Sequence, residues 1–87
     1  LLYEYNIKNF KVMHYDLYRI KNNNELDHLG IFKEEVNTIK IIEWPEIIKT
    51  NIANRLELRL NYSEKENERE FGLVGYGKWK DFNINEL

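Results

Sequence analysis

The sequence contains no cysteine, which excludes disulfide bonds and thiolate metal sites. It has a single proline, and its longest hydrophobic runs are far shorter than the roughly 20 residues that cross a bilayer. No basic segment followed by an apolar stretch marks a secretory signal. These absences exclude a disulfide-stabilised secreted miniprotein, a zinc ribbon and a membrane-spanning helix. We therefore expect a cytoplasmic protein without a membrane segment.

An excess of positive charge is also missing. Thirteen Lys and Arg residues against fifteen Asp and Glu residues give a net charge of -2, whereas sequence-independent nucleic-acid binding depends on a strong positive potential. Direct binding to RNA or DNA is therefore disfavoured. Hydrophobic residues make up 43% of the chain and charged residues 32%, which is typical of a folded domain with a large wetted surface.

The length of the chain limits its core. A chain of 87 residues forms one domain with a small core, so we expect residues 1–87 to be a single domain. The first residue is Leu1, and the only methionine, Met13, lies inside an apolar run. We therefore expect the chain to be a piece of a longer product.

Alternation of hydrophobic and polar residues predicts most of the strands. Residues 1–7 alternate, and residues 11–15 are rich in β-favouring types, which predicts a hairpin. The strictest alternation runs over residues 55–62, and residues 69–76 return as its antiparallel partner after a charged loop. This pattern predicts an antiparallel hairpin with one solvated face over residues 55–76. The tail that follows is mostly polar.

A continuous apolar run and two helix signals complete the predicted fold. Residues 39–44 predict a strand buried on both faces at the centre of a partly parallel sheet, and Pro45 ends it and begins a short helix. Hydrophobic residues at helical spacing predict another short helix, with Asn24 as N-cap and Gly30 as C-cap. The fold class is therefore α/β, with about five strands and two short helices.

The segment GYGKW, residues 75–79, has a superficial likeness to a phosphate-binding loop. That loop requires G-x-x-x-x-G-K-[ST] between a strand and a helix. Here the upstream glycine lies only two positions away, and Trp79 replaces the metal-binding hydroxyl. We expect a turn at the end of a strand instead.

Three side chains are candidates for metal or acid-base chemistry. His14 and Asp16 share one face of a strand and are able to ligate one divalent ion, or His14 is a half-buried strand residue and Asp16 caps the following turn. Glu43 ends the buried strand, where open α/β sheets place metal-coordinating or basic residues, or it is a carboxylate facing water. The residues alone leave both alternatives open.

Trp44 and Arg19 also have two interpretations each. Trp44 packs against the core or its rim, or its exposed indole stacks on a base. Arg19 pairs with an anionic ligand, or it forms an ion pair with Glu25 or Asp27.

Three segments together resemble one known family. HYDLYRI at residues 14–20, ELDHLGIFKE at 25–34 and IKIIEWPE at 39–46, in that order and with those gaps, resemble the carboxyl-terminal half of the TsaE family. This family comprises small ATPases of bacterial tRNA threonylcarbamoyladenosine synthesis. The resemblance extends from about residue 1 to residue 76. It implies a partial P-loop NTPase-like mixed sheet, ATP and magnesium as cofactors, and TsaD and TsaB as partners.

The resemblance also implies roles for single residues. Asp16 matches an acid that family members need for activity, and Glu43 matches the acid that serves magnesium and the attacking water. Trp44 matches a tryptophan near the nucleotide, and His14 and Arg19 match motif positions of the same site. The resemblance thus makes Asp16 and Glu43 the catalytic and metal residues, and Trp44, His14 and Arg19 cofactor-binding residues.

The family's glycine-rich P-loop, with its Lys-Thr pair, and its Ser-Pro-Thr segment have no match in these 87 residues. We therefore expect a truncated or split ATPase subunit that needs a separate amino-terminal P-loop polypeptide and binds neither ATP nor magnesium by itself. The alternatives are a non-enzymatic interaction module that retains the surface for TsaD or TsaB, and a self-sufficient metal hydrolase. An uncovered sheet also predicts self-association into a homo-oligomer.

Overall fold

The structure is a computed structural model that describes residues 2–48 and 52–86. It divides into two compact units, residues 1–51 and residues 52–87, and each is described by itself. The expectation of a single domain stays a prediction. In the part of the chain that the structure describes, no helix is both long and apolar enough to traverse a membrane.

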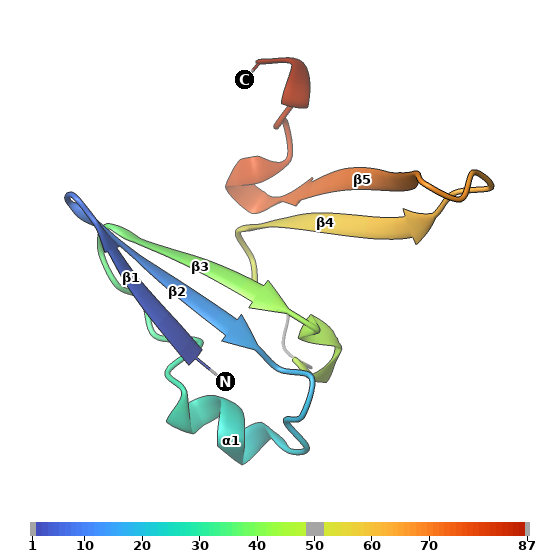
Figure 1. The fold of residues 1–87 in the computed structure, drawn as a ribbon. Helices are drawn as coiled ribbons and strands as arrows, with labels where there is room; N and C mark the ends of the chain where they lie inside the picture. Colours follow the sequence, from blue (N-terminus) through green and yellow to red (C-terminus); the bar gives the residue numbers. More distant parts are fainter. Residues whose placement is uncertain (1, 49–51, 87) are drawn as a thin grey trace. The chain divides into compact units, whose positions relative to one another are not determined.

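The first unit is built on a three-stranded mixed sheet of β1 (Leu2–Ile7), β2 (Phe10–Asp16) and β3 (Thr38–Glu43) (Figure 1). Its order is β1-β2-β3. The first two strands form the predicted antiparallel hairpin, and β2 and β3 are parallel. The α/β class, the mixed sheet and the hairpin are therefore confirmed.

The predicted position of β3 is wrong, because β3 lies at the edge of this sheet and β2 lies at its centre. Its residues alternate in exposure, and Ile39 and Ile41 are each 50% exposed. A run of isoleucines favours a strand covered on both faces, but here only the face of Ile42 packs on the core. One face of β3, with Ile39 and Ile41, is therefore exposed.

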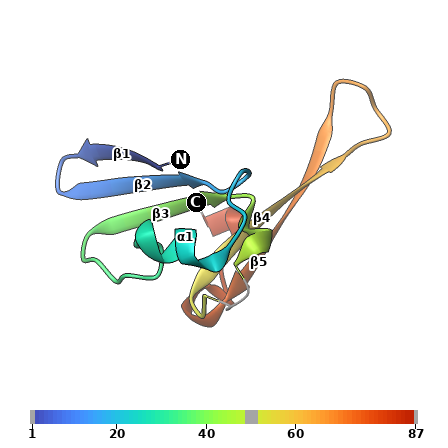
Figure 2. The same ribbon diagram turned by 90° about the horizontal axis from the view of Figure 1, so that it is seen from below.

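The core of the first unit lies between the sheet and α1 (Asn23–His28), which covers one sheet face (Figure 2). Burial raises the pKa of the Tyr15 hydroxyl, with smaller effects from the Glu35 and Glu4 carboxylates. That hydroxyl donates to the carbonyl oxygen of Leu29 at 3.4 Å and ties β2 to the end of α1. The buried hydrophobic side chains are Met13, Tyr15, Leu17, Leu26 and Ile31.

The limits of α1 differ from the predicted ones by one or two residues. Asn22, not Asn24, is the N-cap, because its side-chain oxygen accepts from the Glu25 N–H at 3.1 Å. The C-cap is Leu29, and Gly30 follows it with φ +67°. Capping by an Asn side chain satisfies one of the free N–H groups of the first helical turn.

The short helix predicted to begin at Pro45 starts there as a 3-10 turn, η1 (Pro45–Ile47), and residues 49–51 of the predicted segment lie outside the described residues. The segment between α1 and β3 is tied down by Lys40, whose ammonium donates to the carbonyl oxygens of Gly30 and Ile31 at 3.5 and 3.1 Å, and to that of Lys33. A lysine on β3 thus fixes the loop that leads into its own strand.

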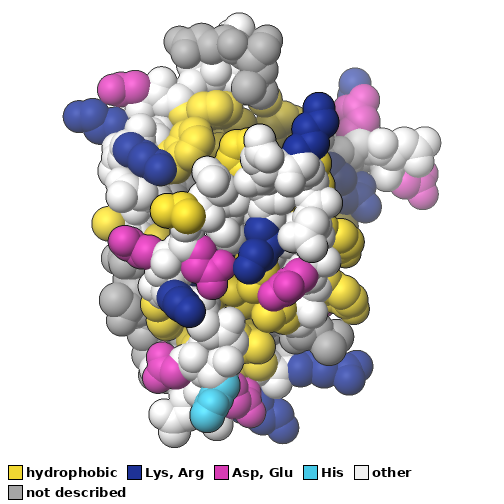
Figure 3. Space-filling view, turned by 90° about the vertical axis from the view of Figure 1, so that its left-hand side faces the viewer, with side chains coloured by type: hydrophobic (Ala, Val, Ile, Leu, Met, Phe, Trp, Pro, Cys, Tyr) yellow, Lys and Arg dark blue, Asp and Glu magenta, His cyan; other side chains and the backbone are white. Residues whose placement is uncertain are grey.

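The second unit is the antiparallel hairpin of β4 (Arg55–Tyr62) and β5 (Arg69–Tyr76), followed by the 3-10 turns η2 (Gly77–Trp79) and η3 (Ile84–Glu86). Both strands have the predicted bounds. Register places Leu58 opposite Leu73 and Leu60 opposite Phe71 on one face. This apolar face is largely exposed. On the side of the molecule that Figure 3 draws, hydrophobic side chains reach the surface between charged ones.

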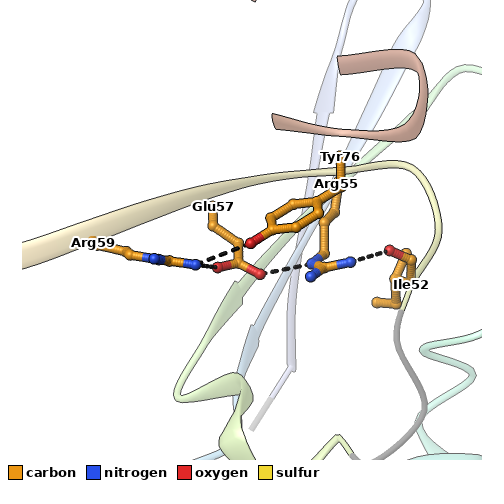
Figure 4. Close-up of polar contacts among 5 residues, drawn as sticks. All are labelled: Ile52, Arg55, Glu57, Arg59 and Tyr76. Atoms are coloured by element: carbon orange, nitrogen blue, oxygen red, sulfur yellow. Dashed lines mark hydrogen bonds and ion pairs between the residues drawn. The ribbon is translucent and has the colours of Figure 1, made fainter. Parts of the chain in front are cut away.

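The other face of the hairpin carries a polar network (Figure 4). The Glu57 carboxylate accepts from Arg59 at 2.8 Å and from Arg55 at 2.7 Å. The Arg55 guanidinium lies 3.7 Å from the centre of the Tyr76 ring and also donates to the Ile52 carbonyl oxygen at 2.8 Å. Hydrogen bonds from Arg59 and then Arg55 lower the pKa of Glu57.

The GYGKW segment forms the turn that its sequence predicts, because β5 ends at Tyr76 and η2 begins at the next residue. A side chain at Gly75 would collide with the carbonyl oxygen of Trp79, and Gly77 has φ +64° and lies against Asn54. The Lys78 N–H donates to the Asn54 side-chain oxygen at 2.9 Å. The glycines therefore serve a tight turn.

Candidate functional site

The two acids singled out in the sequence lie at the same end of the first sheet. Because β2 and β3 are parallel, their carboxyl ends are neighbours, and Asp16 and Glu43 are register partners. The Leu17 N–H donates to the Glu43 carbonyl oxygen at 3.1 Å, so the two strand ends stay hydrogen-bonded one residue beyond β2. Residues 27 positions apart in the sequence are thus brought side by side.

His14 joins the two acids on one face of the sheet. It lies two residues before Asp16 on β2, and side chains two apart on a strand share a face. Its Nε2 is 3.5 Å from Oε2 of Glu43, and its ring centre is 6.0 Å from that of Tyr3 on β1. The structure therefore pairs His14 with Glu43 across the parallel strands.

Asp16 also shapes the backbone that leaves β2. Its Oδ1 accepts from the Tyr18 N–H at 3.1 Å, which is the turn-capping role that its sequence position allows. The turn-capping interpretation is confirmed, and a metal-binding role stays a prediction.

Trp44 follows Glu43 in a left-handed backbone conformation, with φ 58° and ψ 57°. This conformation is uncommon for a residue with a large side chain. Its indole ring lies 5.1 Å from the Tyr18 ring, centre to centre, and both side chains are exposed, Trp44 by 55% and Tyr18 by 68%. Two exposed aromatic rings thus border the acid-bearing end of the sheet.

Tyr18 was missed by the sequence reasoning, although it belongs to the same HYDLYRI segment as Asp16. Tyr18 lies two residues after Asp16, and the Asp16 side chain caps the turn at this point. Such a cap keeps the next side chains beside the end of the strand, so this spacing is the sequence signal for Tyr18. Arg19 lies exposed in the same turn. In the described ranges it forms none of the ion pairs expected with Glu25 or Asp27, and Glu25 accepts instead from the Lys21 N–H at 3.0 Å.

The donor set fits a magnesium ion only in part. Magnesium takes one or two carboxylates from a protein and completes its octahedron with water and substrate phosphates. Asp16 and Glu43 supply two such carboxylates. Among the residues that the structure describes, no group of three His, Cys, Asp or Glu residues is placed to hold a metal ion. A role of these two carboxylates in holding magnesium stays a prediction.

Comparison with known proteins gives one family. A family model described as "Threonylcarbamoyl adenosine biosynthesis protein TsaE" matches residues 1–71. The tRNA threonylcarbamoyladenosine biosynthesis protein TsaE of Rickettsia conorii is 34% identical over 90 aligned residues, which are 87% of this chain and 51% of the relative. The proteins of the same name from Rickettsia felis and Rickettsia typhi are each 50% identical over 50 residues, 56% of this chain and 29% and 34% of the relatives.

The matched region contains every residue of the candidate site, since the site ends at Trp44 and the family model extends to residue 71. The chain spans about half the length, or less, of the curated relatives that it matches. The family resemblance drawn from the three motifs is thus confirmed over most of the chain.

Proposed function

This chain belongs to the TsaE family, and we propose that it supplies the acid-bearing strand ends of an ATPase site used in tRNA threonylcarbamoyladenosine biosynthesis. In this proposal Glu43 orients the attacking water, and Asp16 holds magnesium. Trp44 borders the nucleotide, and His14 and Arg19 complete the surroundings of that site. TsaD and TsaB are the proposed partners.

The observation that carries the proposal is the parallel register of Asp16 with Glu43. Phosphoryl transfer needs an acid that orients the nucleophile and a ligand for the cation, and both must lie near the phosphates. Magnesium, when bound, neutralises charge on the transferred phosphoryl group. His14, 3.5 Å from Glu43, supports the orientation of that carboxylate.

Phosphate binding must come from elsewhere in the proposed enzyme. The only glycine-lysine pair in the sequence, Gly77 and Lys78, belongs to a turn that the Asn54 side chain holds. Two clustered carboxylates repel a polyanion unless backbone N–H groups and a lysine grip the phosphates. We infer that the P-loop is supplied by another segment of a TsaE-family protein, and that these 87 residues alone bind ATP and magnesium negligibly.

Calorimetry tests this proposal. We expect no measurable heat of binding when ATP and magnesium are added to the 87-residue chain. We expect binding after co-expression with the part of the Rickettsia conorii relative that lies outside the match. In a Trp79→Phe background the fluorescence of Trp44 should change on nucleotide addition. Tight magnesium-dependent binding by the chain alone would overturn the division of the site.

Substitution of the acid separates binding from turnover. We expect Glu43→Gln in the co-expressed complex to lower ATP turnover at least tenfold while changing nucleotide affinity less than threefold, because a water-orienting acid acts mainly in the transition state. Glu46→Gln is the matched control, since this exposed acid lies in η1, three residues further along. A complex that folds and binds partners but never hydrolyses ATP would favour a non-enzymatic interaction module.

A further inference from the structure

Tyr18 is exposed, yet the backbone that carries it is held on both sides. The side chain before it, Leu17, is 2% exposed in the core, and the Ile20 N–H donates to the Leu17 carbonyl oxygen at 3.0 Å. The Tyr18 N–H itself donates to Oδ1 of Asp16 at 3.1 Å. The turn, and not burial of the ring, therefore decides the position of a side chain that is 68% exposed.

The ring of Tyr18 lies against the indole of Trp44. The two ring centres are 5.1 Å apart and the ring planes are tilted by 57°, which is within the range of stabilising aromatic pairs. More than half of each side chain is open to solvent. Neither ring is enclosed by close packing, so the contact between them restrains both.

The backbone at Trp44 gives this restraint a consequence for Glu43. Trp44 has φ 58° and ψ 57°, a conformation that persists at a large side chain when the surrounding structure holds it. Glu43 and Trp44 share one planar peptide, so a change of φ at Trp44 rotates the plane that carries the Glu43 carbonyl oxygen. That oxygen accepts from the Leu17 N–H at 3.1 Å. Loss of the left-handed turn would therefore disturb the end of β3 at Glu43.

From these contacts we propose that Tyr18 is a positioning residue for the candidate site. Its ring holds the Trp44 indole, and with it the left-handed turn that sets Glu43 beside Asp16. This inference rests on the proposed function, because it gives Tyr18 a part in presenting the two acids of that site. It assigns Tyr18 no contact with the nucleotide, so Tyr18 acts through Trp44 and Glu43.

Two substitutions separate the ring of Tyr18 from the turn that carries it. Tyr18→Ala removes the ring and keeps the N–H that Asp16 caps. Tyr18→Phe keeps the ring and removes only the hydroxyl group. Tyr62→Ala is the matched control, because Tyr62 is a tyrosine of the second unit that is 85% exposed at the end of β4. Both positions are exposed, so we expect each variant to keep the far-ultraviolet circular dichroism of the parent chain.

Fluorescence of Trp44 in a Trp79→Phe background reports the ring contact. We expect Tyr18→Ala to raise the acrylamide quenching constant of Trp44 by about 1.5-fold or more and to lower its anisotropy, because the indole loses the ring beside it. Tyr18→Phe and Tyr62→Ala should leave both values unchanged. Unchanged quenching in Tyr18→Ala would show that the ring does not hold the indole, and it would overturn the proposal.

Hydrogen exchange at two matched amides reports the strand end. The N–H groups of Leu17 and Lys11 each donate to a carbonyl oxygen of the β3 segment, at 3.1 and 2.9 Å, at opposite ends of the strand pair. We expect Tyr18→Ala to speed exchange of the Leu17 amide about threefold or more, because the turn at Trp44 relaxes, while the Lys11 amide keeps its rate. Equal acceleration of both amides, or none at Leu17, would refute a role of Tyr18 at this strand end.

Turnover in the co-expressed complex tests the consequence for the proposed reaction. We expect Tyr18→Ala to lower kcat for ATP about fivefold or more while KM changes less than about twofold, because displaced acids weaken the transition state. Tyr18→Phe should keep the parent values. A raised KM with unchanged kcat would make Tyr18 a nucleotide-binding residue and overturn the positioning role, as would unchanged values of both constants.

The positioning role and the proposed function fail in different ways. A parent complex that hydrolyses no ATP refutes the proposed function, and the quenching and exchange measurements still decide whether Tyr18 holds Trp44 and the end of β3. A complex that hydrolyses ATP equally well with Tyr18→Ala keeps the proposed function and refutes the positioning role.

Discussion

Trp44 is the residue at which local conformation and the candidate site meet. A left-handed backbone costs a residue with a side chain about 1–2 kcal/mol, and Trp44 adopts it with φ 58°. The conformation turns the chain sharply between β3 and η1 and sets the indole beside Tyr18. Strain of this kind is often retained at functional sites. The strained turn is therefore part of what presents the two aromatic rings beside the acids.

Substitution of Trp44 should reveal that strain. Trp44→Gly loses a ring contact of about 0.5–1.5 kcal/mol but relieves the backbone, so we expect the free energy of unfolding to change by less than about 1 kcal/mol. Trp44→Val loses the same contact and keeps the strain, so we expect a loss of about 1–2 kcal/mol. Urea denaturation followed by circular dichroism measures both. Equal losses for Gly and Val would show that the left-handed turn stores no strain.

At the scale of elements, the β4–β5 hairpin depends on its polar face. The Glu57 carboxylate lies between two arginines of its own strand, and Arg59 also donates to the Tyr76 hydroxyl on β5 at 3.0 Å. Glu57 holds the pKa of Arg59 above its usual value, as Arg59 holds that of Glu57 below. The Glu57 carboxylate thus offsets the repulsion between the guanidinium groups of Arg55 and Arg59 on β4.

The pKa of Glu57 predicts how the hairpin responds to acid. Because its pKa is lower in the folded state than in the unfolded state, its ionised form stabilises the hairpin fully above the unfolded value, and this contribution is lost as pH falls through the folded value. We expect Glu57→Gln to cost less than about 1 kcal/mol at neutral pH, since the network is solvent-exposed. The difference from the parent chain should vanish in acid.

Amide chemical shifts of Val74, which lies opposite Glu57, report this titration. Glu70→Gln is the control, because Glu70 lies on the same face opposite Asn61 and makes none of the Glu57 contacts. A loss of stability by Glu57→Gln that is the same at every pH would show that the ionised carboxylate is not the stabilising group.

The sequence predicted best the strands whose hydrophobic and polar residues alternate strictly. Strict alternation over residues 55–62 and 69–76 gave the bounds of β4 and β5, since period two fixes which side chains share a face. The isoleucine run in β3 was misplaced, because an apolar run shows that a strand is suited to burial but not what covers it. The three consecutive asparagines offered equivalent caps, and only the Glu25 N–H selects Asn22.

The candidate site was partly predictable for a different reason. Asp16 and Glu43 are joined by the parallel pairing of two strands, which local pattern cannot show. The resemblance of the motifs to the TsaE family implied that the two acids serve one site. Tyr18 lies in a turn, where no periodicity marks its orientation, and its contact with Trp44 arises from the bends after β2 and β3. The motifs thus predicted the acids at the strand ends, whereas only the structure shows the contact between Tyr18 and Trp44 beside them.

At the scale of the whole molecule, burial is unequal between the two units. Every fully buried hydrophobic side chain among the described residues lies in the first unit, between Met13 and Ile31. The second unit is a two-stranded hairpin with an exposed apolar face, and such a hairpin is marginally stable in water unless something covers it. The first unit, which holds the acids, therefore holds most of the stability of the chain.

Matched leucine truncations test this asymmetry. Leu26 is 1% exposed and packs α1 on the sheet, whereas Leu60 is 68% exposed on β4. We expect Leu26→Ala to lower the free energy of unfolding by about 2–4 kcal/mol through lost burial and a residual cavity, and Leu60→Ala to change it by less than about 0.5 kcal/mol. Urea denaturation followed by the fluorescence of Trp44, in a Trp79→Phe background, measures the first unit. Comparable losses for the two variants would mean that the hairpin's apolar face is covered in solution, and the stability of the acid-bearing unit would then depend on that cover.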